Sequence, residues 1–267
     1  MNPQALMPNT IPACRVILTC LVMLLLTACA SVDTEERLSA QELFEQAQAA
    51  LEDKNYKLAS EKYEKLEIDH PFSAENRQGQ VDIIYAYYKA EEPESAIAAA
   101  NRFIKLYPRH PKVDYAYYIR ALVNFNRTRG TLDDMFKLDP AVRDPHTAEE
   151  SFQNFAELID RFPDSPYASD SIQRMVHLRN YLARHEIHVA RYYLKLKAYV
   201  AAVNRSKFII ENYSQSPSIT EALTIMAQAY QGLGLDDLAS QTLEVLKANA
   251  PNIPANTTIV NEDDDAS

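Results

Sequence analysis

Cys29 is the side chain whose surroundings most clearly predict a chemical modification. It follows a lone cation, Arg15, an apolar run from Val16 to Leu26 and two small residues. A positive start, an apolar segment of about 7–15 residues and small residues at the cut are typical of a secretory signal. A cysteine directly after the cut is typical of bacterial lipoproteins, in which the thiol carries lipid. We therefore expect residues 1–28 to be removed and Cys29 to become the lipidated first residue.

Two other interpretations of this segment are weaker. The run from Val16 to Leu26 is shorter than the roughly 20 residues that span a bilayer as a helix. A buried helix is disfavoured because residues 1–28 contain no acid and a single base. The residue after Cys29 is Ala30, whereas an aspartate there tends to retain lipoproteins in the inner membrane. We therefore expect the inner leaflet of the outer membrane of a Gram-negative bacterium, with the chain facing the periplasm.

The chain that remains after cleavage is acidic and has no cysteine pair. The formal net charge of the whole sequence is −10, and removal of Arg15 makes it −11. Net charge therefore does not draw this chain to nucleic acid or to anionic lipid. We expect membrane attachment through the lipid on Cys29 and no nucleic-acid partner. Cys14 and Cys20 lie in the removed segment, so no disulfide is expected.

No set of residues predicts catalysis, a metal or a cofactor. His185 and His188 resemble a zinc-protease motif, but they are three rather than four residues apart and no third ligand is evident. The pair Gly232 and Gly234 is expected to form a helix–helix turn, because no strand precedes it as in a nucleotide-binding loop. The serines lack a nucleophile-elbow setting. We therefore expect a protein that is not an enzyme.

Tyrosine is the unusual residue, with sixteen copies and no tryptophan. An aromatic groove with hydroxyl groups suits an extended peptide, because tyrosine offers contact area at low entropic cost together with a polar tip. Arg120, Arg127 and Arg143 could bind carboxylates there. For any single residue, ordinary helix packing or a solvated arginine is an equally good explanation. The candidates for the groove are Tyr85, Tyr88, Tyr115, Tyr118 and Arg120.

A repeated spacing predicts the elements that position these residues. In five segments a small residue is followed at +4 and +7 by residues on the same helix face, and at +12 by a proline in four of the five. A partner helix is expected before each segment. This is the tetratricopeptide pattern, an all-α right-handed superhelical solenoid of five antiparallel helix pairs, although a generic helical bundle is the alternative. The small residues are Ala59, Ala96, Ser151, Ala202 and Ala239.

The intervals between repeats suggest where the array is irregular. Unit three is interrupted from about residue 127 to 147, which we interpret as an ordered loop or a short helix. Unit four continues without a breaker, so its helices are expected to be longer. Long insertions in compact arrays usually carry function. The expected organisation is a signal peptide at 1–28, a lipidated tether at 29–38, repeats at about 39–72, 73–110, 111–165, 166–216 and 217–250, and an acidic disordered tail at 251–267.

The motifs together resemble a known family. They include Asp82 to Lys89, Arg102 to Ile104, the segment Pro108 to Tyr115, Arg143 to Pro145, and Val200 to Arg205. With the lipoprotein signal and five repeats they are similar to the BamD family, the lipoprotein subunits of the outer-membrane β-barrel assembly (BAM) complex. The resemblance covers nearly all of the expected mature chain. The sequence departs from the family at its end, where the acidic tail is longer.

The resemblance implies an outer-membrane protein assembly factor. Family members hold a BamA-like β-barrel insertase through its periplasmic domains with their C-terminal repeats, associate with other BAM lipoproteins, and receive unfolded outer-membrane proteins with their N-terminal repeats. Carried over to this chain, Arg205 is the candidate contact to the insertase. The tyrosine groove is the candidate site for the C-terminal signal of an incoming barrel protein. The alternative is a tetratricopeptide lipoprotein that acts as a pilotin or as a cell-wall scaffold adaptor.

Overall fold

The computed structural model describes residues 37–128, 139–142 and 144–249. The signal peptide, Cys29, nearly all of the tether, Arg143 and the acidic tail lie outside these residues. Within the described part of the chain every regular element is helical. None of these helices is long and apolar enough to cross a membrane.

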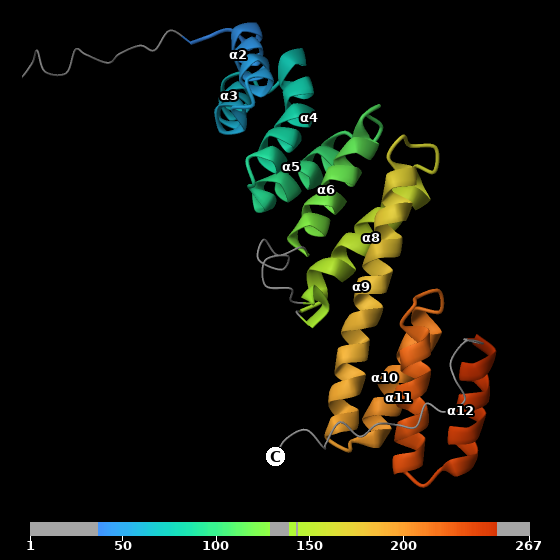
Figure 1. The fold of residues 1–267 in the computed structure, drawn as a ribbon. Helices are drawn as coiled ribbons and strands as arrows, with labels where there is room; N and C mark the ends of the chain where they lie inside the picture. Colours follow the sequence, from blue (N-terminus) through green and yellow to red (C-terminus); the bar gives the residue numbers. More distant parts are fainter. Residues whose placement is uncertain (1–36, 129–138, 143, 250–267) are drawn as a thin grey trace, which may run out of the picture.

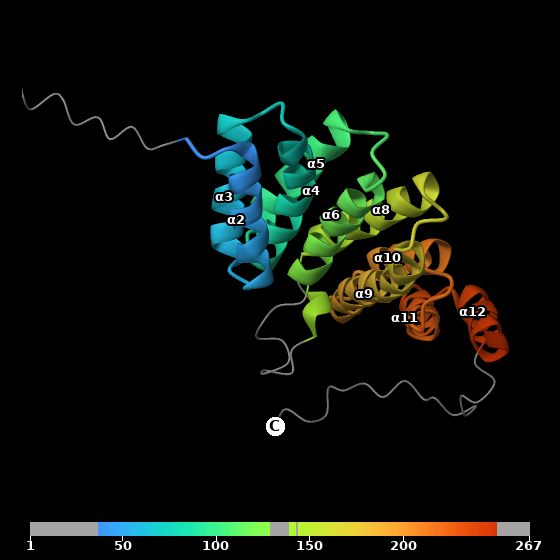
Figure 2. The ribbon, with the colours of Figure 1, turned by 90° about the horizontal axis from the view of Figure 1, so that it is seen from above.

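The helices form five consecutive antiparallel pairs, and each helix packs against the next in the chain (Figures 1 and 2). The predicted all-α solenoid of five helix pairs is confirmed. The pairs are α2 (Ala40–Glu52) with α3 (Tyr56–Asp69), α4 (Ala74–Lys89) with α5 (Pro93–Leu106), α6 (Val113–Arg127) with α8 (His146–Arg161), α9 (Ala168–Lys195) with α10 (Tyr199–Asn212), and α11 (Ile219–Gly232) with α12 (Asp236–Asn249).

The repeated small residues lie where the two helices of a pair approach each other. All five are buried in the second helix of their pair, and so are the larger residues Tyr63, Phe103, Phe155, Ile209 and Leu246. A small side chain at the facing position lets two helix axes approach closely, and the larger residue one or two turns later fills the space beside it. The repeated spacing of small and larger residues in the sequence therefore corresponds to the residues that pack between the helices of each pair.

The turn within a pair has the same backbone form in four of the five units. Its middle residue is left-handed: Lys54, Glu91, Lys197 or Gly234, with φ between 58° and 71°. In each case the next residue donates its N–H to a carbonyl five residues earlier, as Leu235 does to Tyr230. This is a Schellman-type helix end, for which glycine is the least strained choice. The glycine turn predicted for unit five is thus confirmed, and three other units make the same turn without glycine.

Helix α9 is the irregular element of the array. It has 28 residues, whereas α10 has 14, so the prediction of longer helices in unit four is right for the first helix and wrong for the second. Its first half contributes Leu178, Tyr181 and Leu182 to an N-terminal core. Its second half contributes Ala183, Ile187 and Ala190 to a separate C-terminal core. One helix therefore joins an N-terminal block of three units to a C-terminal block of two (Figure 1).

Candidate functional site

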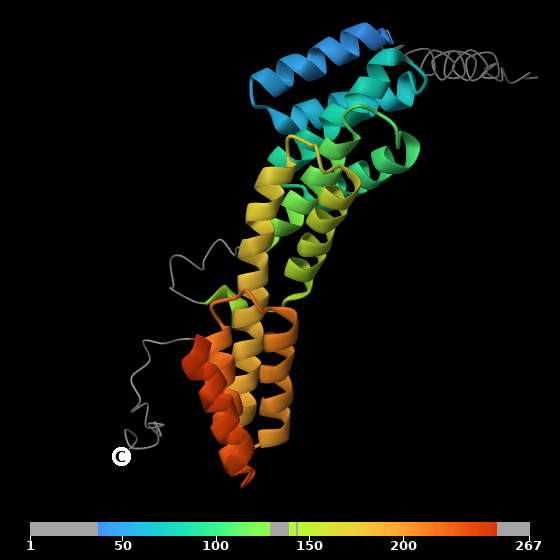
Figure 3. The same cartoon turned by 90° about the vertical axis from the view of Figure 1, so that its right-hand side faces the viewer.

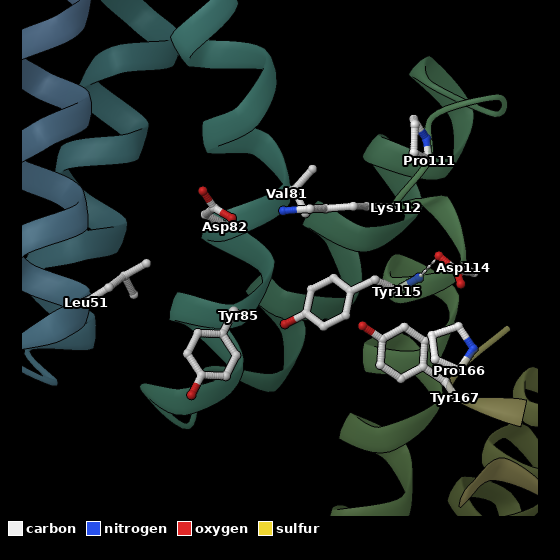
Figure 4. Close-up of a pocket in the computed structure, with 10 residues that line it drawn as sticks. All are labelled: Leu51, Val81, Asp82, Tyr85, Pro111, Lys112, Asp114, Tyr115, Pro166 and Tyr167. Carbon is white, nitrogen blue, oxygen red and sulfur yellow. Dashed lines mark hydrogen bonds between the residues drawn. The ribbon is translucent and has the colours of Figure 1, made fainter. Parts of the chain in front are cut away.

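The N-terminal block contains a cavity of about 470 Å³ that is walled by tyrosines, which we call the tyrosine cavity (Figure 4). It opens between the first helices of successive units, where groove residues were expected. Tyr85 comes from α4 and Tyr115 from α6, whereas Tyr167 precedes α9. The remaining lining residues are Leu51, Val81, Asp82, Pro111, Lys112, Asp114 and Pro166.

The rings of the cavity belong to a longer row of aromatic side chains. Tyr85 packs edge-on against Tyr56, with ring centroids 6.0 Å apart. Tyr115 lies 5.7 Å from Tyr167, and Tyr167 stacks on Tyr118 at 4.7 Å with 17° between the planes. Such edge-to-face and stacked pairs add roughly 0.5–1.5 kcal/mol beyond their buried area. The row therefore holds its rings in place before any ligand arrives.

Polar groups line the cavity beside the rings. The carboxylate of Asp82 accepts hydrogen bonds from Gln48 and Gln78, at 2.9–3.0 Å. That of Asp114 accepts the hydroxyl of Ser165 at 2.7 Å. Lys112 is the sole cation among the lining residues. The cavity thus combines ring faces with both donors and acceptors, a composition that can bind an extended peptide through its side chains and its backbone.

Tyr115 and Tyr118 keep their hydroxyl protons and can donate hydrogen bonds. Burial raises the pKa of Tyr115 well above its ordinary value, and the nearby carboxylate of Asp82 acts in the same direction. Burial also raises the pKa of Tyr118 to about 12, helped by the hydrogen bond that it donates to Asp170 at 2.8 Å. At any physiological pH these residues are neutral donors with an apolar ring.

Four of the five predicted groove residues lie in or near this row. Tyr85 and Tyr115 line the cavity, and Tyr118 lies one ring away. Tyr88 is outside the lining, where its hydroxyl accepts a hydrogen bond from Asn126 at 2.8 Å. The structure brings Tyr85, Tyr115 and Tyr118 into one row and leaves Tyr88 beside it.

Arg120 does not lie in the cavity. Its guanidinium donates to Glu157 at 2.6 Å and to Asn101 at 3.0 Å, and it covers the ring of Tyr117 at 4.9 Å. At 3.6 residues per turn, Arg120 points about 140° around α6 from Tyr115. It therefore ties α6 to the second helices α5 and α8 on the opposite face. The second predicted arginine, Arg127, pairs with Glu94 at 3.0 Å.

Of the ten lining residues, the groove candidates included only Tyr85 and Tyr115, and the missed residues include Tyr167 and Lys112. Tyr167 follows a proline in the turn before α9, and Lys112 follows a proline in the turn before α6. The available signal was a proline two residues before the first helix in three units, at Pro111, Pro166 and Pro217. It marks where the chain turns onto the next first helix and hence beside the groove.

A second recess lies in the C-terminal block and includes Arg205. It measures about 360 Å³ and is lined by Tyr193, Ala201, Asn204, Arg205 and Phe208, which we call the docking patch. Arg205 is half-exposed and donates to the largely buried Glu186 at 3.1 Å. Exposed apolar side chains flank the patch at the turn between α9 and α10, namely Tyr192, Leu196 and Val200.

The two histidines of the zinc-like motif hold the end of the unit-three insertion. A short 3₁₀ helix, η1 (Pro140–Val142), packs on the middle of α9. Nδ1 of His185 lies 2.8 Å from the carbonyl oxygen of Ala141, and Nε2 of His188 lies 2.8 Å from Oδ2 of Asp139. Among the described residues, no three histidine, cysteine or acidic side chains converge as metal ligands. We call residues 139–142 the strap.

Asp139 is the charged link of the strap. Burial acts to raise the pKa of its carboxyl group, but hydrogen bonds from His188 and from the backbone N–H of Ala141, with the charge of Arg184, outweigh burial and lower the pKa. Ala141 itself is fully buried in the N-terminal core. The strap therefore contacts α9 near the boundary between the N-terminal core and the C-terminal core.

Comparison with known proteins connects this architecture to one family. The family model described as "YfiO: Outer membrane lipoprotein" matches residues 36–246. Outer membrane protein assembly factor BamD of Neisseria meningitidis serogroup A is 43% identical, over 90% of this chain and 92% of that protein. The protein of the same name from Vibrio cholerae is 36% identical, over 86% and 95%.

The likeness to the solved structure of MamA protein is remote. MamA protein aligns over 78% of this chain and 90% of its own, at 17% identity and a TM-score of 0.30. A likeness of this size carries no functional argument.

Proposed function

The chain belongs to the YfiO family of outer-membrane lipoproteins, and we propose that it is a non-enzymatic assembly factor for outer-membrane proteins. In this proposal the tyrosine cavity binds extended, aromatic-rich segments of unfolded β-barrel precursors. The docking patch holds a BamA-like insertase through its periplasmic domains, in company with other BAM lipoproteins. Lipid on Cys29 keeps the chain at the inner leaflet of the outer membrane. Substrate capture and insertase binding thus occur in different blocks of one molecule.

The observation that carries the capture step is the row of tyrosines at the N-terminal groove. Tyr85, Tyr115 and Tyr167 come from three places in the chain and surround one cavity. Ring faces suit the aromatic side chains that alternate along a β-strand, and the hydroxyl and carboxylate groups suit its backbone. The open groove does not require a single sequence, which fits a factor that handles many precursors.

The docking step is supported by the chemistry around Arg205. An arginine beside exposed apolar side chains is a common core for a protein interface, since its planar guanidinium binds carboxylates in a fork and its stem packs on apolar groups. Glu186 holds the guanidinium in place, so little side-chain entropy remains to be lost on binding.

Peptide binding tests the capture step. A peptide from the C-terminal strand of an outer-membrane β-barrel protein, carrying a photo-crosslinker, is expected to label the tyrosine cavity. Tyr85→Ala removes a half-exposed ring and is expected to weaken binding by about 1–2 kcal/mol, or roughly five- to thirty-fold. Tyr230→Ala is the matched control, because this partly buried tyrosine lies in α11, outside both sites. Equal binding by both variants would contradict the proposal.

Purification from detergent-solubilised outer membranes tests the identity of the partner. The proposed assembly factor is expected to bring down a large β-barrel protein. A pilotin or a cell-wall scaffold adaptor would instead bring down secretion or wall components without it. Cys29→Ala is expected to release the chain from the membrane fraction, and its retention in the absence of the insertase would contradict lipid anchoring.

A further inference from the structure

Three strongly exposed apolar side chains of the N-terminal block lie together at one edge. Phe72 is 96% exposed, Ile68 78% and Leu106 54%. Removal of such side chains from water is favourable. Neither the tyrosine cavity nor the docking patch includes them. We call this surface, formed by the ends of α3 and α5 and the turns that follow them, the membrane edge.

Contacts place this edge beside the beginning of the described chain. Nε2 of His70 lies 2.8 Å from the carbonyl oxygen of Leu38 and so holds the start of α2 against the turn that contains Phe72. Glu67 pairs with Arg102 at 3.0 Å and brings the ends of α3 and α5 together. In Figure 3 the start of α2 and both turns lie on the same side of the molecule.

The edge is basic although the chain as a whole is acidic. Residues 65–77 and 102–112 hold six Lys and Arg against three Asp and Glu, whereas the whole sequence has a net charge of −10. Arg77, Lys105 and Arg109 are exposed, and within the described residues no ion pair engages them. The edge therefore presents free cations around protruding apolar groups.

We propose that this edge rests on the anionic phospholipid surface of the leaflet that holds the lipid of Cys29, with Phe72 and Ile68 inserted among the headgroups. The proposal extends the lipid anchoring proposed above. Residues 29–37 lead from the anchor to Leu38, and nine extended residues reach roughly 30 Å at most. An anchor so close raises the local concentration of the edge at the bilayer, so individually weak contacts suffice.

The composition of the edge favours lipid as the occupant. Apolar side chains surrounded by lysine and arginine gain both from headgroup insertion and from attraction to anionic lipid. The negative net charge of the whole chain predicts no such attraction, because it sums acidic and basic residues that the fold places on different surfaces. The contact would fix the orientation of the first two units relative to the bilayer, and hence the direction in which the tyrosine cavity opens relative to the membrane.

A depth measurement tests the proposal independently of natural lipidation. The mature chain without Cys29 has no thiol, so an introduced cysteine can be labelled alone. Phe72→Cys, bearing an environment-sensitive fluorophore, is held by an N-terminal histidine tag on vesicles of phosphatidylethanolamine, phosphatidylglycerol and a nickel-chelating lipid. Val245→Cys on α12, far along the chain, is the matched control because its side chain is also exposed and apolar.

Blue-shifted emission and quenching by bilayer-borne nitroxide lipids are expected at position 72 and not at position 245. Lys105→Glu combined with Arg109→Glu is expected to reduce the quenching at position 72, as is replacement of phosphatidylglycerol by phosphatidylcholine. Absence of quenching at position 72 on tethered protein would overturn the proposal, whatever the fate of Cys29 in cells. Protection of position 72 only when the insertase is added would also overturn it and would assign the edge to a protein partner.

Discussion

The N-terminal and C-terminal blocks share one repeat but are packed differently. The N-terminal core buries the aromatic residues Tyr63, Phe103, Phe155 and Tyr181 among its members. The C-terminal core is built from alanine and isoleucine alone among its buried residues. Large rings fix neighbouring helices at many contacts, whereas small side chains bury less area in each unit. The difference indicates a rigid block around the tyrosine cavity and a thinner block that leaves apolar side chains exposed beside Arg205.

The largest effect that tests this comparison is loss of a core ring. Phe155→Ala leaves a cavity in the N-terminal core and is expected to lower the free energy of unfolding by about 3–5 kcal/mol. Ile209→Val removes a single methylene group from the C-terminal core and is expected to cost about 0.5–1.5 kcal/mol. Urea unfolding followed by circular dichroism measures both. Equal losses would remove the proposed difference between the blocks.

The second test separates the two sites. Arg205→Glu places a second carboxylate next to Glu186 and is expected to weaken insertase binding by about 2 kcal/mol or more, since both attraction and position are lost. Peptide crosslinking to the tyrosine cavity is expected to stay unchanged, and so is the helical content. Co-purification of the insertase reports the effect, and Lys207→Glu on the same helix is the control, because its partner Glu211 also lies on α10. A simultaneous loss of peptide binding would mean that the blocks act as one site.

The smallest test concerns the junction between the blocks. Asp139→Asn weakens the interactions of the strap with His188 and Arg184. These interactions are partly exposed and contribute at most about 1 kcal/mol to the free energy of unfolding. Because the pKa of Asp139 is lowered in the folded chain, its carboxylate stabilises the strap above about pH 4, and that stabilisation is lost as pH falls through the lowered pKa. Hydrogen exchange of residues 139–149 is expected to accelerate in the variant at neutral pH and in the parent only in acid. Equal exchange in both proteins at neutral pH would show that the burial of Ala141 alone holds the strap.

Much of the fold follows from local patterns. The five spacings of a small residue and a larger residue, followed by proline in four units, indicate where each second helix lies, what it buries and where it ends. Tyr85 and Tyr115 could be placed at the groove because both lie on the first helix of a pair, and the first helices of such repeats line the groove. Such features depend on residues within one or two helical turns, and helical geometry determines those contacts directly.

The contacts between units could be seen only in the tertiary structure. Tyr118 bonds Asp170 across 52 positions of the chain, and His188 holds Asp139 across 49. Arg120 turned away from the groove because Glu157 and Asn101 from neighbouring helices offered it partners. The division of the core along α9 and the basic edge around Phe72 likewise arise from surfaces assembled by several units. The sequence by itself determined the repeat and predicted a lipid anchor, because those signals are local. The groove, the strap and the edge needed the stacking of one unit on the next.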